Sequence, residues 1–404
     1  MGESVNGQSD HLPLDGGGLG GGDARIIVTR EELANLVRSL ERADRLAVDV
    51  EADSLHRYEE QPCLLQISTD EETWVVDPLA IGGVDPLGPI FGDPAVEKVF
   101  HGSDYDIRLL KRAAGFDFSN IFDTMISAQL LGLPEVGLQA LLAARFGVVL
   151  DKKFQRADWS KRPLAPEMIR YAAEDTRHLL RLRDELASEL DSRGRMEWAR
   201  EEFEILCRIQ PAPRRVPSWS DIKGSGKLPS RDRAVLQALV EFRDGEARRL
   251  DRPPFKVLGS PVLLDLARRR PRTPGDLQGI VGLTPRLVDR YGRAILDAAR
   301  KGETVPADEY ARTDRGRPPR PSPEQIARLA RLKAVRDEAA RNLGIDPALL
   351  ANRAALEEIA FSEPDALAAT LTARLKTWQR SVLEKEFRRV HLSTDRGVLP
   401  HAPP

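Results

Sequence analysis

Two acidic residues lie two positions apart in a stretch that is otherwise typical of a buried strand. In RLAVDVEADSL, Val48 and Val50 have the β-branched character of a sheet interior, yet Asp49 and Glu51 alternate with them. Because side chains alternate across a strand, both carboxylates project from the same face. Two like charges about 6 Å apart repel by roughly 3 kcal/mol at an effective dielectric of about 20, and desolvation adds to this cost. A hard divalent cation, which takes oxygen ligands, would turn the repulsion into attraction.

The Asp-x-Glu pair is weak evidence alone, because an edge strand that faces water would carry it equally well. Two further motifs add carboxylates. In FHGSDYDIRLL, Asp104 is expected to cap a helix, whereas Asp106 is the better ligand candidate. In RYAAEDTRHLL, Tyr171 and Asp175 lie four apart and share one helix face. Here the structural alternative is a core tyrosine and an aspartate paired with an arginine, so each motif is ambiguous when taken singly.

The elements that must position these acids alternate between strand-like and helix-like runs from Arg25 to about Cys207. Five short β-rich runs predict strands: ARIIVT, RLAVDVEA, CLLQIST, ETWVVDP and VEKVFHG. Helical patterns follow over 30–43, 103–115, 123–132, 137–147 and 166–190. This alternation indicates an α/β domain with a central sheet and a helical second half.

After the Pro-rich run RIQPAPRRVPSW the sequence is typical of helices only, and two helical regions match each other. LQALVEFRDGEARRLDRPP and LARLKAVRDEAARNLGIDP align at one constant offset (336 − 243 = 93) that places the Arg243-Asp244 pair on Arg336-Asp337. Recurrence of Leu and Arg by chance is the alternative, but identity in the Arg-Asp and Ala-Arg pairs favours a duplication. A second basic, Pro-rich run, ARTDRGRPPRPSP, separates the two copies.

Composition limits the class of protein. The 404 residues are 41% hydrophobic and 31% charged with a net charge of −2, which predicts a globular protein of two or three domains and leaves a polyanionic partner open. The opening residues, MGESVNGQSDHLPLDGGGLGGGD, have no apolar core, so they predict a Gly-rich tail and no secretory signal. Cys63 and Cys207 form no C-x-x-C pair, which disfavours a disulfide framework or a zinc site. We therefore expect a cytoplasmic location.

Taken together, the acidic motifs are more specific. An Asp-x-Glu on a strand, an Asp one strand-helix unit later and a Tyr-x-x-x-Asp on a late helix resemble the DEDD superfamily of 3′-5′ exonucleases, in its tyrosine subgroup. YEEQPCLLQIS, WVVDPL, FHGSDYDI, IFDTMISAQLL, LDKKFQRADWSKRPL and YAAEDT resemble, in that order, the ribonuclease D family. The duplicated C-terminal half is similar to the helical HRDC domains of that family.

The resemblance implies an α/β ribonuclease H-like nuclease domain, a mixed sheet flanked by helices, followed by two all-α HRDC-like domains. The expected parts are a disordered tail over 1–24, the exonuclease domain over 25–208, a linker over 209–224, an HRDC domain over 225–304, a basic linker over 305–321, a second HRDC-like domain over 322–390 and a tail over 391–404.

The resemblance also implies a two-metal hydrolysis. Asp49, Glu51, Asp106 and Asp175 would hold two Mg²⁺ or Mn²⁺ ions about 3.5–4 Å apart, and Tyr171 would orient the attacking water. The substrate would be RNA with a single-stranded 3′ end, such as a tRNA precursor or another structured RNA, and the products 5′-mononucleotides. A DNA exonuclease and a catalytically silent nucleic-acid-binding scaffold are the alternatives.

Basic residues supply candidate nucleic-acid contacts. Lys152, Lys153 and Arg156 are interleaved with Phe154 and Trp159, a mixture that can bind a phosphate backbone and stack a base. A loop that only packs on the nuclease core is the alternative. A second basic cluster comprises Arg268, Arg269, Arg270 and Arg272, and the second linker adds Arg312, Arg315, Arg317 and Arg320. Solvated surface is the alternative for both of these groups.

Overall fold

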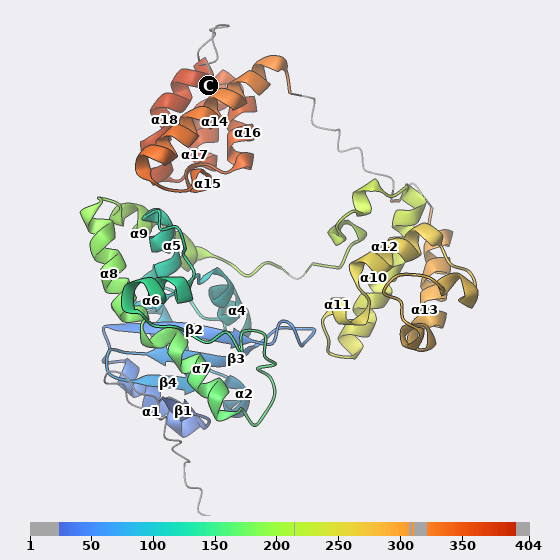
Figure 1. Ribbon diagram of the computed structural model, residues 1–404, viewed down its shortest axis with the longest axis horizontal. Coiled ribbons are helices and arrows are strands. Elements are labelled where there is room, and N and C mark those ends of the chain that lie inside the picture. Colours follow the sequence, from blue (N-terminus) through green and yellow to red (C-terminus); the bar gives the residue numbers. More distant parts are fainter. Residues whose placement is uncertain (1–23, 214, 307–308, 311–320, 393–404) are drawn as a thin grey trace, which may run out of the picture.

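The computed structural model of the protein describes residues 24–213, 215–306, 309–310 and 321–392. These residues form three units, a sheet domain and two helical units (Figure 1). The predicted N-terminal tail, most of the second linker with its four arginines, and most of the C-terminal tail lie outside the described residues. In the part of the chain that is described, no helix combines the length and apolar character that a membrane crossing requires.

The central sheet has six strands in the order β1-β4-β3-β2-β5-β6. The strands are β1 (Arg25–Ile27), β2 (Arg45–Ala52), β3 (Pro62–Ser68), β4 (Thr73–Val76), β5 (Glu97–Phe100) and β6 (Ile121–Asp123). The β2–β3 and β3–β4 pairs are antiparallel, whereas the β1–β4, β2–β5 and β5–β6 pairs are parallel. The sheet is therefore mixed, as predicted. Strand β6 was not predicted because its three residues are too few to show an alternating pattern.

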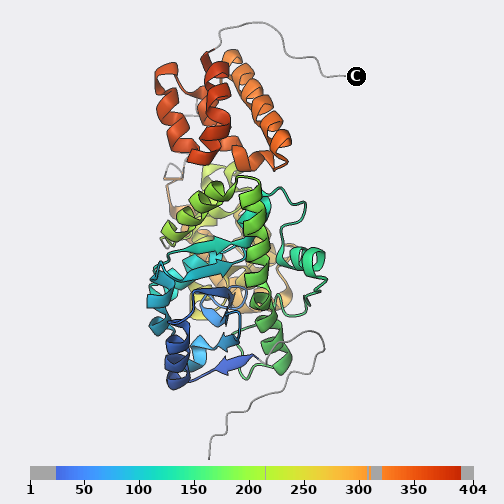
Figure 2. The same ribbon diagram turned by 90° about the vertical axis from the view of Figure 1, so that its left-hand side faces the viewer.

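Helices cover both faces of this sheet (Figures 1 and 2). They are α1 (Arg30–Leu40), α2 (Pro78–Ile81), α3 (Gly88–Gly92), α4 (Asp104–Ala114), α5 (Thr124–Leu130), α6 (Leu138–Phe146), α7 (Pro166–Arg177), α8 (Leu179–Ser192) and α9 (Met196–Arg208). Helices α1, α3 and α4 share one core cluster with Val48 and Val50 of β2. Helix α7 lies against the opposite face, where Ala172 and Ala173 pack with Leu64 and Val75.

The single helix predicted over 166–190 is wrong in one respect, because it is broken at His178. This residue ends α7 and begins α8 with φ −105° and ψ −1°, and its N–H bonds to the carbonyl of Thr176. The break allows two different packing directions. Helix α7 stays against β3 and β4, whereas α8 buries Leu182 and Leu186 in a cluster shared with α5 and α9. The apolar spacing continues across the break, so no sequence pattern marks it.

The two helical units repeat one another over their first three helices. The first contains α10 (Ser230–Arg249), α11 (Pro254–Val257), α12 (Ser260–Arg269) and α13 (Pro285–Thr304), and the second α14 (Pro323–Leu343), α15 (Pro347–Leu350), α16 (Arg353–Phe361), α17 (Leu367–Arg374) and α18 (Thr377–Leu392). Helices α14, α15 and α16 each begin at one constant offset from α10, α11 and α12 (323 − 230 = 93).

A matched hydrogen bond accompanies this repeat. Arg243 donates to the carbonyl of Leu258 at 3.3 Å, and Arg336 donates to the carbonyl of Ala351 at 2.9 Å. The two acceptor residues, Leu258 and Ala351, are separated by the same offset as the helices (351 − 258 = 93). The equivalence in side-chain bonding supports an internal duplication over a chance recurrence of Leu and Arg.

The second helical unit packs on the end of the sheet domain formed by α9, as Figure 2 shows. Trp198 of α9 stacks on Trp378 of α18 with ring centroids 5.0 Å apart. Glu202 accepts a hydrogen bond from the Trp378 indole N–H at 2.7 Å and pairs with Lys376 at 2.5 Å. Arg195, which is buried, donates to the carbonyl of Leu343 at 2.6 Å. This interface therefore combines aromatic packing with buried hydrogen bonds.

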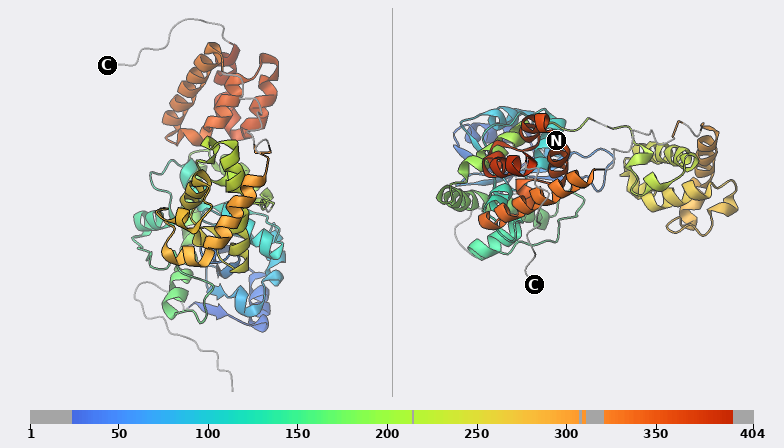
Figure 3. Two further views of the ribbon diagram at one scale, coloured as in Figure 1. Left: turned by 90° about the vertical axis from the view of Figure 1, so that its right-hand side faces the viewer. Right: turned by 90° about the horizontal axis from the view of Figure 1, so that it is seen from above.

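The first helical unit stands to one side of the sheet and meets the loop that joins β2 to β3 (Figure 3). Tyr58 in this loop donates its hydroxyl to Asp244 of α10 at 2.6 Å. Arg57 pairs with Asp251 at 2.6 Å. The loop that leaves the acidic strand β2 is thus also the contact surface for this helical unit.

We expect Glu202→Ala to lower the free energy of unfolding by about 1–3 kcal/mol, because Trp378 would keep a largely buried N–H without an acceptor. Glu197→Ala is the matched control. It removes an exposed acid of the same helix that pairs with the exposed Arg200, and should change the free energy by less than about 0.5 kcal/mol. Urea unfolding followed by tryptophan fluorescence measures both. Equal losses in the two variants would contradict the role given to Glu202.

Candidate metal centre and active site

Strand β2 presents its two acids to the face that α7 covers. Val48 and Val50 are buried in the core on the other face, so strand alternation places Asp49 and Glu51 together under α7. In the antiparallel ladder Asp49 lies opposite Gln66 and Glu51 opposite Leu64. Pairing on both sides fixes β2 in the middle of the sheet. The alternative of a water-facing edge strand is therefore wrong.

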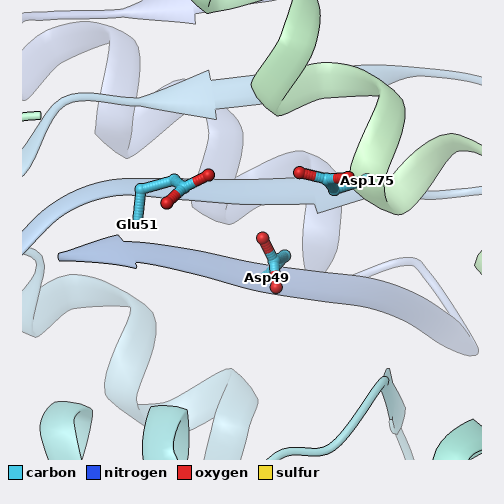
Figure 4. Close-up of side chains that lie close together, drawn as sticks. All are labelled: Asp49, Glu51 and Asp175. Carbon is cyan, nitrogen blue, oxygen red and sulfur yellow. The ribbon is translucent and has the colours of Figure 1, made fainter. Parts of the chain in front are cut away.

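Helix α7 brings a third carboxylate to the same place. Single oxygen atoms of Asp49, Glu51 and Asp175 lie within 4.8 Å of one another. Figure 4 shows the three side chains converging from β2 and α7. All three are half-buried. Asp175 makes no pair with an arginine among the residues described, which removes the structural alternative proposed for it.

Asp106 lies close to this group without being one of the three. It is 8% exposed and stands in the first turn of α4, where the positive end of the helix dipole favours an acid. Burial raises the pKa of Asp106, and the charge of Asp49 raises it further. The charge of Asp106 in turn adds to the rise in the pKa of Glu51. The assignment of Asp106 as a fourth ligand stays a prediction. Asp104, expected as the cap, is instead the first residue of α4 and pairs with Arg108.

Burial raises the pKa of every carboxyl in the group. It raises the pKa of Asp49 to about 6. Burial, and then the neighbouring acids, raise the pKa of Asp175 to about 8 and that of Glu51 to about 9. Within the described chain no basic side chain offsets these shifts. Uncompensated carboxylates at this spacing are the hard oxygen donors that Mg²⁺ and Mn²⁺ take, so the donor set fits a divalent cation.

Tyr171 lies one helical turn before Asp175 on α7. Its ring contacts Phe154 edge-on, with centroids 5.8 Å apart, and Trp159 at 6.0 Å. Burial, and then the charge of Asp175, raise the pKa of the phenol above its ordinary value. Tyr171 therefore stays protonated at neutral pH and offers a hydrogen-bond donor beside the acids. The ring packs against the core cluster of this face, as the structural alternative expected, and it also lines the pocket beside Asp175.

Asp123 is a supporting residue outside the acidic motifs that the sequence singled out. It caps α5, accepting hydrogen bonds from the N–H groups of Met125 and Ile126. Its carboxylate also accepts from the N–H of Gly102 and from both the N–H and the hydroxyl of Ser103. These bonds hold the turn that begins α4, and so fix Asp106. Asp123 follows directly on strand β6, which the sequence pattern did not reveal.

The loop before α7 lines pockets on both sides of the acids. A pocket of about 430 Å³ is lined by Lys153, Tyr171 and Asp175, and one of about 150 Å³ by Glu51 and Arg156. Lys152 is exposed on the same loop and lines neither pocket. The interpretation of Trp159 as a base-stacking residue is wrong. Its ring is 1% exposed because it packs beneath Tyr171.

The predicted basic cluster on the first helical unit is exposed at the end of α12. Arg269 pairs with Asp265 at 3.1 Å, and Arg270 pairs with Asp232 at 3.5 Å. Arg268 is exposed beside them. Arg272, the fourth member of the cluster, pairs with Glu303 at 3.3 Å. Three of the four cations thus pair with acids, and the contact of this cluster with nucleic acid stays a prediction.

Comparisons with known proteins agree with this geometry. A family model described as 3′-5′ exonuclease matches residues 24–191, and one described as HRDC domain matches residues 232–298. Ribonuclease D of Gluconacetobacter diazotrophicus is 31% identical over 372 residues, which cover 90% of this chain and 92% of that protein.

Two solved structures have a similar fold. The catalytic core of RRP6 from Trypanosoma brucei matches with a TM-score of 0.63 and 29% identity, over 69% of this chain and 79% of that one. Escherichia coli RNase D matches with a TM-score of 0.70 and 24% identity, over 91% of this chain and 98% of that one. The chain therefore belongs to the ribonuclease D family, and it is a 3′-5′ exoribonuclease that carries an HRDC domain after its nuclease domain.

Proposed function

We propose that this exoribonuclease hydrolyses phosphodiester bonds with two divalent cations, Mg²⁺ or Mn²⁺, held by Asp49, Glu51, Asp106 and Asp175. The convergence of three carboxylate oxygens within 4.8 Å, with no basic side chain to neutralise them among the described residues, is the observation that supports it most. When bound, such cations activate a water nucleophile and stabilise charge on the leaving 3′ oxygen. The protein supplies a rigid set of ligands on one strand and two helices.

Tyr171 has a separate role in this proposal. Because its pKa is raised, the phenol is a poor base and a persistent donor. Its position one turn from Asp175, between Phe154 and Trp159, limits the directions that the hydroxyl can take. We assign it the orientation of the attacking water by hydrogen bonding.

The proposed substrate is RNA with a single-stranded 3′ end, trimmed to 5′-mononucleotides, in tRNA precursors or other structured RNA. Membership of the ribonuclease D family supports RNA over DNA. The two pockets beside the acids, about 150 and 430 Å³, suit single nucleotides better than a duplex. Lys153 and Arg156 in the pocket walls, with Lys152 nearby, would contact phosphates, as would Arg268, Arg269 and Arg270 on the HRDC domain.

The proposal predicts metal-dependent release of mononucleotides from a tailed RNA, abolished by EDTA. Asp49→Asn should lower the turnover number by roughly 100- to 1,000-fold. Asp104→Asn is the matched control, because this acid is exposed on α4 and pairs with Arg108 of the same helix. RNA and DNA strands of one sequence are compared in the same assay. Activity that survives Asp49→Asn would refute the metal site, and faster cleavage of DNA would refute the substrate.

Tyr171→Phe should lower the turnover number by roughly 100-fold, because the water loses its orienting donor. RNA binding, measured with a non-cleavable strand, should change little because the ring and its packing remain. Tyr291→Phe serves as the control, since this tyrosine is buried in α13 of the HRDC domain. An equal loss of binding and turnover would contradict the orienting role.

The raised pKa values predict that a rise in pH lowers the stability of the metal-free protein and raises its affinity for Mn²⁺. The pKa values of Asp49, Asp175 and Glu51 lie at about 6, 8 and 9 in the folded chain and return to about 4 on unfolding. The folded state then binds more protons than the unfolded state, so metal-free stability falls as pH rises from about 4 to about 9. Affinity for Mn²⁺ rises over the same range, because binding displaces those protons.

Melting temperatures across this pH range, with and without Mn²⁺, measure both trends. Glu51→Gln should flatten the decline of the metal-free protein, because it removes the carboxyl whose pKa is raised most among those with a stated value. A metal-free protein that becomes more stable between about pH 5 and pH 9 would contradict the electrostatic account of the site.

A further inference from the structure

Gln66 of β3 is a fully buried polar residue without a partner. Its side chain is 0% exposed, and neither its amide oxygen nor its amide nitrogen makes a hydrogen bond to any other described residue. No other side chain in the described chain has two buried polar atoms in this state. Buried polar groups are nearly always paired, so this exception needs a physical reason.

Among its neighbours in the sheet, Gln66 has one polar side chain that could accept a hydrogen bond from its amide. Across the β2–β3 ladder Gln66 lies opposite Asp49, and across the β3–β4 ladder it lies opposite Val75. Directly opposed residues of an antiparallel pair share one face, with Cβ atoms about 4.5–5.5 Å apart. Leu64, two positions before it on β3, is apolar, and Ser68, two positions after it, already bonds to other residues.

Helix α7 closes this face from above. Its Thr176 hydroxyl lies 2.7 Å from the hydroxyl of Ser68, and Asp175 immediately precedes Thr176. Gln66 is therefore enclosed between β2, β4 and the helix that carries another acid of the cluster. These elements shield the Gln66 side chain from water.

We propose that, once a cation occupies the site, the amide nitrogen of Gln66 donates a hydrogen bond to the carboxylate of Asp49 and so holds that carboxylate in position on the metal. This inference rests on the proposed function, in which Asp49 is a metal ligand. An ionised carboxylate has two oxygens, and one that directs an oxygen to a cation leaves the other in need of a donor. The ionised form strengthens such a bond. Donors of this kind orient metal ligands and tune metal affinity.

The residue type fits this role. An apolar side chain of similar length would pack at least as well between Leu64 and Val75, so packing alone does not require an amide. The amide of Gln66 instead provides N–H donors without adding another negative charge to a group that already repels itself. Gln66 acts through Asp49 and is a positioning residue.

The test replaces Gln66 by methionine, which keeps the length of the side chain and removes the donor. Full-length wild type and Gln66→Met are titrated with Mn²⁺ by calorimetry, and their melting temperatures are measured with and without Mn²⁺. We expect Mn²⁺ to bind about 10- to 100-fold more weakly to Gln66→Met. The melting temperature without metal should stay the same or rise, because a buried unpaired amide has been removed.

Ser68→Ala is the matched control. It removes the neighbouring buried hydroxyl, which bonds to Thr73 and Thr176, and should lower the metal-free melting temperature while leaving Mn²⁺ affinity unchanged. Wild-type Mn²⁺ affinity in Gln66→Met would overturn the inference. A loss of Mn²⁺ affinity would also overturn it if the metal-free melting temperature of Gln66→Met fell as far as that of Ser68→Ala, since the loss would then be a structural effect.

Asp49→Asn separates this inference from the proposal on which it rests. If wild type and Asp49→Asn bind Mn²⁺ equally, the proposed metal site itself is wrong. If Asp49→Asn loses Mn²⁺ affinity while Gln66→Met keeps it, only the role of Gln66 is wrong. Weaker binding in both variants, with the metal-free stability of Gln66→Met retained, supports both.

Discussion

Mutual repulsion of carboxylates in a half-buried site is the constraint on which the nuclease domain depends. Asp49, Glu51 and Asp175 bring oxygens within 4.8 Å of one another, and burial raises the pKa of each. In the described chain nothing basic relieves this repulsion. The surrounding elements must therefore hold the acids against it. A central strand and a helix packed on the sheet provide that rigidity, and a cation that binds replaces the protons that the raised pKa values retain.

The two faces of β2 have different roles, because one packs in the apolar core and the other carries the acids. Val48 and Val50 join the large apolar cluster with α1, α3 and α4, so the strand is stabilised from the side away from the acids. The α7 face, by contrast, carries a smaller apolar cluster that includes Leu64, Val75 and Trp159, together with a few buried polar groups. A register shift of one residue would move both acids into the apolar core. The same alternation that stabilises the sheet thus fixes where the acids stand.

Sequence reasoning worked where periodicity and spacing carry the information. The central sheet, the two faces of β2, the placement of Asp175 one turn after Tyr171 and the repeat of the helical units follow from regular patterns, whereas the mixed strand pairing was implied by the family resemblance. It failed where tertiary packing decides. The break at His178 interrupts no apolar pattern, β6 is too short to show one, and Trp159 is buried by a contact with Tyr171 that lies twelve residues away in sequence. No pattern in one chain reveals that Gln66 lacks a partner.

Strand β2 also links the acids to the HRDC domain. Directly after Glu51 and Ala52, the buried Asp53 accepts hydrogen bonds from the N–H and the side-chain amide of Gln61, which closes the loop between β2 and β3. Tyr58, at the far side of this closed loop, bonds to Asp244 of α10. The loop is therefore held at its base by one buried acid and at its tip by the helical domain. Because the base begins two residues after Glu51, displacement of the helical domain acts on a segment that is continuous with the acidic strand.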